Sequence, residues 1–287
     1  MIPFFCPTKN RASQCRLMLE SINRNAPGIF RPNILWKADP KYVAGYEKLM
    51  NEQWVKDMDA NFIQETDMIK QFYQFLEYAA NDILDNKYCA LFMDDCIFYR
   101  SLKVDKDKLK SLFTDNTWCV SLRLGQNTII QDYITGESQK EIGPGYCIDE
   151  FIHYEFKEHH PHKNYGFHFS WDGVIYRPED ILKIFNGTDF TKTDNQWAIA
   201  PQRIENYMMN RRDEVPYSMM CCPEHSCVVC MNWNCTHPYA KTGVKFGGGM
   251  EEMQELYMQD YVINLDSIDF SNVRSCHEEL GYTYKKI

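Results

Sequence analysis

Two kinds of segment alternate along the first third of the chain, and they differ in the spacing of their apolar residues. Short apolar runs, typical of strands, are separated by longer segments whose apolar residues have helical spacing. The strand-like runs cover residues 1–6, 33–37, 61–63 and 88–93. The helical segments cover residues 12–24, 40–50 and 67–84. This βαβαβαβ order predicts an α/β fold with a mixed, mostly parallel central sheet flanked by helices, resembling a Rossmann fold.

The second half of the chain has a less regular pattern. Two apolar runs around Pro223, residues 217–222 and 227–233, predict a hairpin. Polar segments at 126–144 and 153–168 predict long loops. Further strands are expected at 118–124 and 167–176. Further helices are expected to start at Pro178 and to cover 201–212 and 251–258.

The apolar run 88–93 leads directly into Asp94 and Asp95. Ligands of open α/β sheets bind just beyond the carboxyl ends of such strands. Two carboxylates at that position are costly unless they meet a cation or a hydrogen-bond network. The pair therefore indicates a divalent metal that holds a phosphate-bearing ligand.

Charge and composition narrow the classes of partner. The formal net charge is −9 and no basic run is longer than two residues, so nucleic acid is not an expected partner. The N-terminus does not read as a signal peptide, and no stretch approaches about 18 apolar residues, so we expect no transmembrane segment. The 12 cysteines are then expected to be reduced, in the cytoplasm.

Four separated segments carry a family resemblance. They are residues 6–11 (CPTKNR), 92–98 (FMDDCIF), 120–127 (VSLRLGQN) and 172–177 (DGVIYR). In this order they resemble the P-T-x-N-R loop, the D-x-D strand end, and the S-L-R-L-G-x-N and D-G-x-I-Y-R segments of nucleotide-sugar-dependent glycosyltransferases with the GT-A fold. The last two segments are similar to those of a microbial and viral branch of these enzymes.

The resemblance implies one GT-A-like domain over residues 1–287. Residues 1–125 would bind the nucleotide sugar, and residues 126–287 would form the acceptor side. The implied activity is metal-dependent transfer of a hexose from a nucleoside-diphosphate sugar to a hydroxyl acceptor, expected to be a glycan. A single inverting displacement is the first expectation. A retaining transferase on the same fold, or a nucleotide-sugar-binding protein without catalysis, remains open.

The resemblance also implies a metal site for Mn²⁺ or Mg²⁺, made by Asp94, Asp95 and the late His277. Here the chain departs from the pattern, because Cys96 replaces the last aspartate of the D-x-D motif and a thiol is a poor ligand for these hard ions. If the strand continues, Asp94 and Cys96 share one face; if it ends at Met93, Asp95 can turn into the site. We expect Asp95 to bind the metal directly and Asp94 to contact the ribose or an outer shell. His277 is equally interpretable as a surface residue.

The donor-binding residues that the resemblance implies are Pro7, Thr8, Arg11, Asp39, Asp94, Arg123 and Asn127. An arginine suits bidentate contact with a phosphate, although Arg123 is as readily explained by a structural ion pair. Asp39 can read a base edge or cap the helix that begins at Pro40.

Asp172 is the first candidate for the general base. It follows the aromatic-rich segment 167–171, where burial would raise the pKa of a carboxyl group toward a useful range. The alternative is that Asp172 and Gly173 form a tight turn. Glu205 is a rival base or an acceptor contact, unless it is an exposed helical residue.

A group of cysteines and histidines in residues 221–237 supports a different class of protein. Cys227 and Cys230 have zinc-ligand spacing, with Cys222 or His225 before them and Cys235 or His237 after them. A zinc-stabilised interaction protein is therefore the alternative. Against it, a strand through this segment would place Cys227 and Cys230 on opposite faces.

Overall fold

A nine-stranded sheet forms the centre of the computed structural model, which describes residues 1–287 except 82–86, 144, 187–199 and 234–248. In spatial order the strands are β3 (Asn61–Gln64), β2 (Phe30–Lys37), β1 (Ile2–Lys9), β4 (Cys89–Leu91), β11 (Val174–Tyr176), β6 (Thr117–Ser121), β12 (Met219–Pro223), β10 (Phe151–Glu155) and β9 (Gly145–Ile148).

The first four strands in sequence are all parallel neighbours, as the alternation of strands and helices predicts. β11 is antiparallel to both of its neighbours, β4 and β6, and β10 is antiparallel to β9 and β12. The expected mixed α/β sheet flanked by helices is thus confirmed. Both halves of the chain contribute strands to this one sheet, and they meet where β4 of the first half pairs with β11 of the second.

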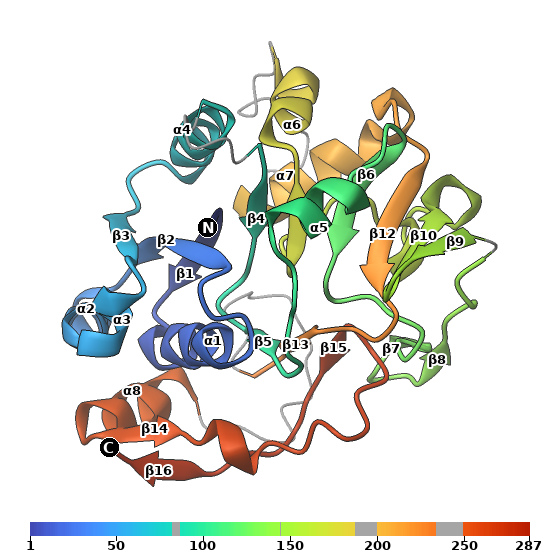
Figure 1. Cartoon of the computed structure of the whole chain (residues 1–287). Coiled ribbons are helices and arrows are strands. Elements are labelled where there is room, and N and C mark those ends of the chain that lie inside the picture. The colour runs from blue at the N-terminus through green and yellow to red at the C-terminus, as the bar shows by residue number, and fades with distance from the viewer. Residues whose placement is uncertain (82–86, 144, 187–199, 234–248) are drawn as a thin grey trace.

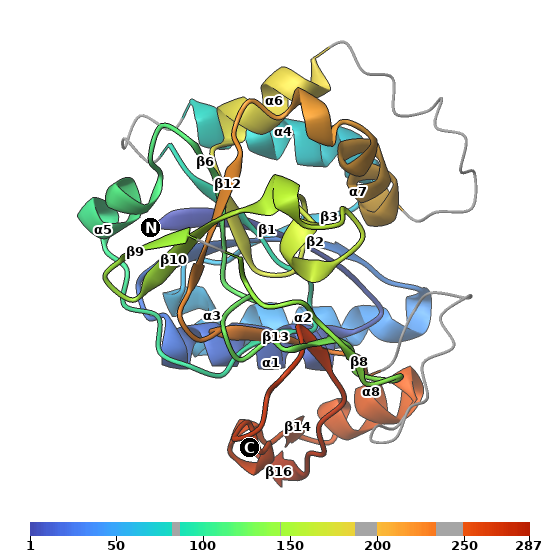
Figure 2. The ribbon, with the colours of Figure 1, turned by 90° about the vertical axis from the view of Figure 1, so that its right-hand side faces the viewer.

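Helices cover the two faces of the sheet as separate layers (Figures 1 and 2). One layer contains α1 (Ala12–Asn25), α2 (Val43–Asn51) and α3 (Gln53–Asp57). The other contains α4 (Met68–Ala80), α6 (Pro178–Phe185) and α7 (Ala200–Asn210). The shorter helical elements are α5 (Lys106–Leu112), α8 (Met250–Met258) and the 3₁₀ turns η1 (Pro40–Tyr42), η2 (Phe156–Glu158), η3 (Asn164–Gly166), η5 (Arg212–Glu214) and η6 (Leu265–Ser267).

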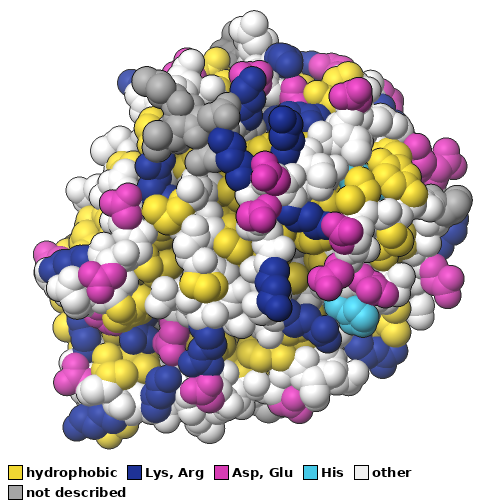
Figure 3. All heavy atoms as spheres, viewed as in Figure 1, with side chains coloured by type: hydrophobic (Ala, Val, Ile, Leu, Met, Phe, Trp, Pro, Cys, Tyr) yellow, Lys and Arg dark blue, Asp and Glu magenta, His cyan; other side chains and the backbone are white. Residues whose placement is uncertain are grey.

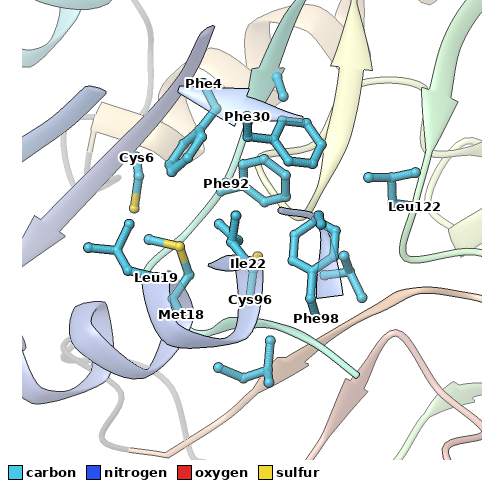
Figure 4. Packing of buried hydrophobic residues seen from close by; sticks show 14 of the residues in the cluster. Phe4, Cys6, Met18, Leu19, Ile22, Phe30, Phe92, Cys96, Phe98 and Leu122 are labelled. Carbon is cyan, nitrogen blue, oxygen red and sulfur yellow. The ribbon is translucent and has the colours of Figure 1, made fainter. Parts of the chain in front are cut away.

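Strand β1 is buried on both faces, which explains its continuous apolar run. Phe4 and Cys6 pack into the core on the α1 side, whereas Phe5 packs on the α4 side against Phe72 and Phe75. Figure 4 shows Phe4 and Cys6 near the side chains that α1 turns toward the sheet. The alternation follows from the two-residue period of a strand.

The predicted hairpin at residues 217–233 is wrong. Strand β12 lies in the large sheet, whereas β13 (Val228–Met231) is the middle strand of a separate three-stranded sheet. Its neighbours are β5 (Cys96–Phe98) and β15 (His277–Glu278). Pro223 to Ser226 therefore carry the chain from one sheet to the other. Two further ribbons are β14 (Tyr261–Ile263) with β16 (Tyr284–Lys286), and β7 (Ile130–Asp132) with β8 (Glu137–Ser138).

Among the described residues, none of the helices has the length and apolar character needed to cross a bilayer. On the face drawn in Figure 3, basic and acidic side chains are interspersed.

Because β11 runs antiparallel to β4 and β6, its first residue lies beside the last residues of those two strands. Val174, the first residue of β11, is opposite Leu91 at the end of β4 and Ser121 at the end of β6. Residues that follow β4 and β6 therefore meet residues that precede β11. Gly173 makes this junction: its N–H donates to the Leu91 carbonyl oxygen at 3.0 Å, and its carbonyl oxygen accepts from the Leu122 N–H at 2.8 Å.

Gly173 has a φ of +76°, and a Cβ added there would lie 3.0 Å from Val228 Cγ1. We predict that Gly173→Ala destabilises the fold by clearly more than the roughly 1–2 kcal/mol of left-handed backbone strain alone. Gly28→Ala is the matched control, because Gly28 has a φ of +71° with nothing within 4 Å of the added Cβ. Urea unfolding measures both; equal losses would contradict close packing at Gly173.

Candidate active site

The turn after β4 decides how the two adjacent aspartates are placed. β4 ends at Leu91, and the Cys96 N–H donates to the Met93 carbonyl oxygen at 3.1 Å, which closes a tight turn over Asp94 and Asp95. Asp94 points inward and its side chain is 0% exposed, while that of Asp95 is 17% exposed. Of the two arrangements considered from the sequence, the strand therefore ends early and Asp95 faces the more open side.

Asp94 is held by residues at the end of β1. Thr8 Oγ1 donates to Asp94 Oδ2 at 2.6 Å, and Arg11 Nε donates to the same oxygen at 3.0 Å. Arg11 Nη2 pairs with the other oxygen, Oδ1. Tyr46 Oη lies 2.7 Å from Thr8 Oγ1 and accepts from the Arg11 N–H at 3.1 Å. These contacts occupy the carboxylate, so a metal bound to Asp94 would have to displace Arg11.

Asp95 lies between two other carboxyl groups and one guanidinium. Its Oδ2 is 3.8 Å from Arg11 Nη1. Burial, aided by the nearby charges of Asp94 and Asp172 and opposed by Arg11, raises the pKa of Asp95 to about 7. A cation beside this group would replace the proton that burial favours.

Three polar groups surround the carboxylate of Asp172, just before β11. Its Oδ2 lies 3.3 Å from Arg123 Nη1, 3.1 Å from Ser170 Oγ and 3.6 Å from His277 Nε2. Arg123 follows β6, and its side chain is only 3% exposed. Its Nε has no hydrogen-bond partner among the described residues. The structure thus gives Arg123 a partial ion pair and leaves one buried donor unused.

Glu205 projects from α7 toward the same edge. Its Oε1 accepts from the Trp171 N–H at 3.3 Å. Burial, followed by the charge of Asp172, raises the pKa of Glu205 to about 8. Glu205 is therefore a half-buried acid near Asp172, not an exposed helical residue.

The other predicted donor-site residues lie at the margins of this centre. The amide of Asn127 is bound within the protein: its Nδ2 donates to Tyr99 Oη at 3.1 Å, Ser226 Oγ at 2.9 Å and the Val273 carbonyl oxygen at 3.0 Å. Pro7 is buried within β1. Asp39, at the end of β2, accepts from Asn10 Nδ2 at 2.8 Å and makes no side-chain cap for η1.

The structure adds two thiols to the predicted metal site. Asp95, Cys96 and Cys230 form one group whose ligand atoms all lie within 4.8 Å of one another, and Asp172, Cys230 and His277 form a second. Mg²⁺ demands oxygen ligands in near-octahedral geometry, and Mn²⁺ likewise prefers oxygen ligands. With Asp94 occupied by Arg11 and two sulfur atoms present, this donor set fits a hard ion poorly.

Most of the predicted zinc cluster at residues 221–237 does not come together. Cys221 and Cys222 belong to the two different cores on either side of the large sheet. Cys227 Sγ donates to the His225 carbonyl oxygen at 3.8 Å, on the backbone before β13. Cys235 and His237 lie outside the described residues. Within the described part of this segment, Cys230 alone joins a metal-ligating group.

Three side chains of the site were not selected from the sequence: Tyr46, Ser170 and, as a neighbour of Asp95, Cys230. Tyr46 lies on α2, in a stretch of sequence that matches no functional motif. Cys230 was noticed for its spacing from Cys227, but its actual partner, Cys96, is 134 positions away. Only the pairing of β5 with β13 could reveal that contact.

Together these residues make a compact, partly open acidic centre. Asp95, Asp172 and Glu205 are three carboxyl groups, and the two guanidinium groups of Arg11 and Arg123 lie against them. Such a centre can exchange a proton, bind a cation and contact an anionic group through Arg123.

No protein-family model matches the sequence. No curated protein matches it either.

Among solved structures, the chain is similar to the galactosyltransferase LgtC in complex with donor and acceptor sugar analogues, with 12% identity, 90% of this chain and 96% of that chain covered, and a TM-score of 0.40. It is also similar to core-mannan synthase A from Aspergillus fumigatus in its Mn/GDP form, at 10% identity, 74% and 64% coverage and a TM-score of 0.33. A third similar structure is the mannosyltransferase Ktr4p of S. cerevisiae in complex with GDP. The identity is 10%, 75% of this chain and 62% of that chain are covered, and the TM-score is 0.29. At these TM-scores the similarity assigns no function to the chain.

The Arg11–Asp94 pair makes a direct prediction about stability. Arg11→Met should cost about 3–5 kcal/mol, because it leaves a buried carboxylate without its counter-charge. The double variant Arg11→Met/Asp94→Asn should recover part of this loss, because a neutral amide needs no counter-charge. Denaturant unfolding of the single and double variants gives the coupling. Additive losses, or a loss below about 1 kcal/mol for Arg11→Met, would contradict a tightly coupled pair.

Proposed function

We propose that this chain is a glycosyltransferase that moves a sugar, of hexose type, from a nucleoside-diphosphate sugar to a hydroxyl group of a glycan. The observation that carries the proposal is the convergence of Asp95, Arg123, Asp172 and Glu205 at one edge of the sheet. The first three lie in separate segments that resemble GT-A transferases, and the β4, β6 and β11 ends unite those segments. A site for glycan biosynthesis needs the chemistry these groups supply: an anion-binding cation and a base.

The donor diphosphate is the anionic part of the substrate, and Arg123 is the group we assign to it. Its buried, unused Nε–H suits a phosphate oxygen, because an unpaired buried donor is costly until a ligand accepts from it. The nucleoside would lie over the carboxyl ends of β1 and β2. There Trp36 stacks on Tyr46 with ring centroids 5.2 Å apart, and Asn10 and Asp39 offer polar groups.

The acceptor hydroxyl must lose a proton as it attacks the sugar. Asp172 is the first candidate for this base from the sequence, but one oxygen of its carboxylate already faces Arg123, Ser170 and His277, which leaves it less free to take up the acceptor proton. Glu205 is half-buried, has no cationic hydrogen-bond partner among the described residues, and lies near enough to Asp172 to feel its charge. We therefore assign proton removal to Glu205 and orientation of the acceptor to Asp172. A base on the face opposite the leaving group gives inversion.

A divalent cation is part of the proposal, with Asp95 and His277 among its ligands. When bound, such an ion stabilises the charge that builds on the leaving diphosphate. Two thiols belong to the same group of ligand atoms, and the choice of ion therefore depends on them.

Nucleotide binding is the first test of this function. We expect one of UDP, GDP, dTDP and CDP to raise the thermal midpoint of the chain, by the equivalent of about 2.7 kcal/mol at 100 times its dissociation constant. Arg123→Gln should abolish that shift. Lys183→Gln is the control, because that side chain is 70% exposed and lies on α6. If none of the nucleotides shifts the midpoint, the donor site is not where we place it.

Catalysis is tested by pH dependence and by the anomer formed. With Glu205 as base, kcat/KM should rise with pH to a plateau above about 8, because the carboxyl group must be deprotonated. Glu205→Gln should lower kcat roughly 10²–10⁴-fold and remove the rising limb of the pH profile. Asp172→Asn should lower the activity but leave the rising limb in place.

The control variant is the exposed Glu214→Gln, which should behave as the wild type. If Asp172→Asn removes the limb instead, Asp172 is the base. Product analysis by NMR should show an inverted anomer, and a retained anomer would exclude this mechanism. Nucleotide-sugar binding without turnover would leave only the binding function.

A further inference from the structure

Three side chains form one row across the small sheet beside the acidic centre. Cys96 of β5 pairs in register with Cys230 of β13, and Cys230 pairs in register with His277 of β15. Residues in register on adjacent strands project on the same face and are separated by about 5 Å. The row therefore places two thiols and an imidazole side by side.

The distances within the row suit a small, thiophilic cation. The Sγ atoms of Cys96 and Cys230 are 3.4 Å apart, close to the edge of a tetrahedron whose metal–sulfur bonds are about 2.3 Å. An oxygen of Asp95 lies within 4.8 Å of both sulfur atoms, and a ring nitrogen of His277 lies within 4.8 Å of Cys230 Sγ. Cys230 is thus the common neighbour of all three other groups.

A backbone donor and the pattern of exposure also suit a bound ion. The Met93 N–H points at Cys96 Sγ, with the nitrogen 3.4 Å from the sulfur, and hydrogen bonds of this kind orient the ligands of metal sites. Cys96 and Cys230 are fully buried, whereas the His277 side chain is 35% exposed and that of Asp95 is 17% exposed. An ion can therefore enter from the side of His277 and Asp95 and reach the sulfur atoms behind them.

We propose that Cys96, Cys230, His277 and Asp95 form a binding site for Zn²⁺ or a similarly thiophilic divalent ion, in place of Mn²⁺ or Mg²⁺. Sulfur and nitrogen donors in four-coordinate geometry select zinc, whereas hard ions need more oxygen ligands than this group offers. The inference deepens the proposed function by naming the ion. It does not depend on turnover, because metal content is measured without any sugar nucleotide.

The experiment uses the full chain, purified without chelator and analysed for metals by mass spectrometry. We expect one equivalent of zinc per chain. After the metal is removed, Co²⁺ should bind and produce a thiolate-to-cobalt charge-transfer absorption, while Mn²⁺ and Mg²⁺ should not compete with it. This spectrum is recorded on the wild-type chain and so does not depend on whether a variant folds.

Variants then locate the site. Cys230→Ser and Cys96→Ser should each weaken zinc binding by more than about 100-fold, which exceeds the usual effect of an outer-shell contact. Cys227→Ser is the matched control, because Cys227 is also buried and lies three residues away, but belongs to neither group of ligand atoms. It should keep the metal.

Three results would overturn the proposal. A chain that binds Mn²⁺ as tightly as Zn²⁺ does not use the thiols. Loss of zinc in Cys227→Ser would place the metal in the 221–237 segment instead. A metal-free chain in which peptide mapping finds Cys96 linked to Cys230 would mean that the two residues form a disulfide and not a metal site. Each of these outcomes is distinct from a failure of nucleotide binding, which would leave a zinc site without the proposed activity.

Discussion

The balance of charge at one edge of the sheet is the constraint on which the rest of the site depends. Four carboxyl groups, Asp94, Asp95, Asp172 and Glu205, approach one another there, and two arginines accompany them. Arg11 pairs with both carboxylate oxygens of Asp94, and Arg123 contacts one oxygen of Asp172. Asp95 and Glu205 are half-buried and lack a full counter-charge, and burial raises their pKa values to about 7 and about 8. A bound proton or cation would relieve this excess of negative charge.

The buried Arg11–Asp94 pair has a mechanical consequence as well. It connects the loop after β1 to the turn after β4, two segments that the parallel sheet already places side by side. With Asp94 anchored inward, the tight turn leaves Asp95 facing the opening. Adjacent residues with the same side chain thus have different surroundings: Asp94 is bound within the structure, and Asp95 is left partly exposed.

The small three-stranded sheet adds sulfur atoms to the site. It pairs segments that follow β4, β12 and β14, and so brings sulfur atoms next to the carboxylates. Cys96, judged from its place in the motif, weakens the case for a hard metal. Cys96 judged together with Cys230 and His277 supports a softer one, because the chemistry of a site depends on its whole donor set.

The sequence alone determined the parallel βαβ half of the fold, because the period of its apolar residues sets strands and helices locally. It also selected the residues on which the proposed function depends: the acids after β4, Asp172 at a turn and the late His277. Only the tertiary structure decided that β12 and β13 part into two sheets, that Asn127 binds within the protein, and that Cys96 meets Cys230. Those outcomes depend on contacts between distant parts of the chain, such as Cys96 with Cys230, 134 positions apart, and Asn127 with Val273, 146 positions apart. No local pattern encodes contacts between residues so distant along the chain.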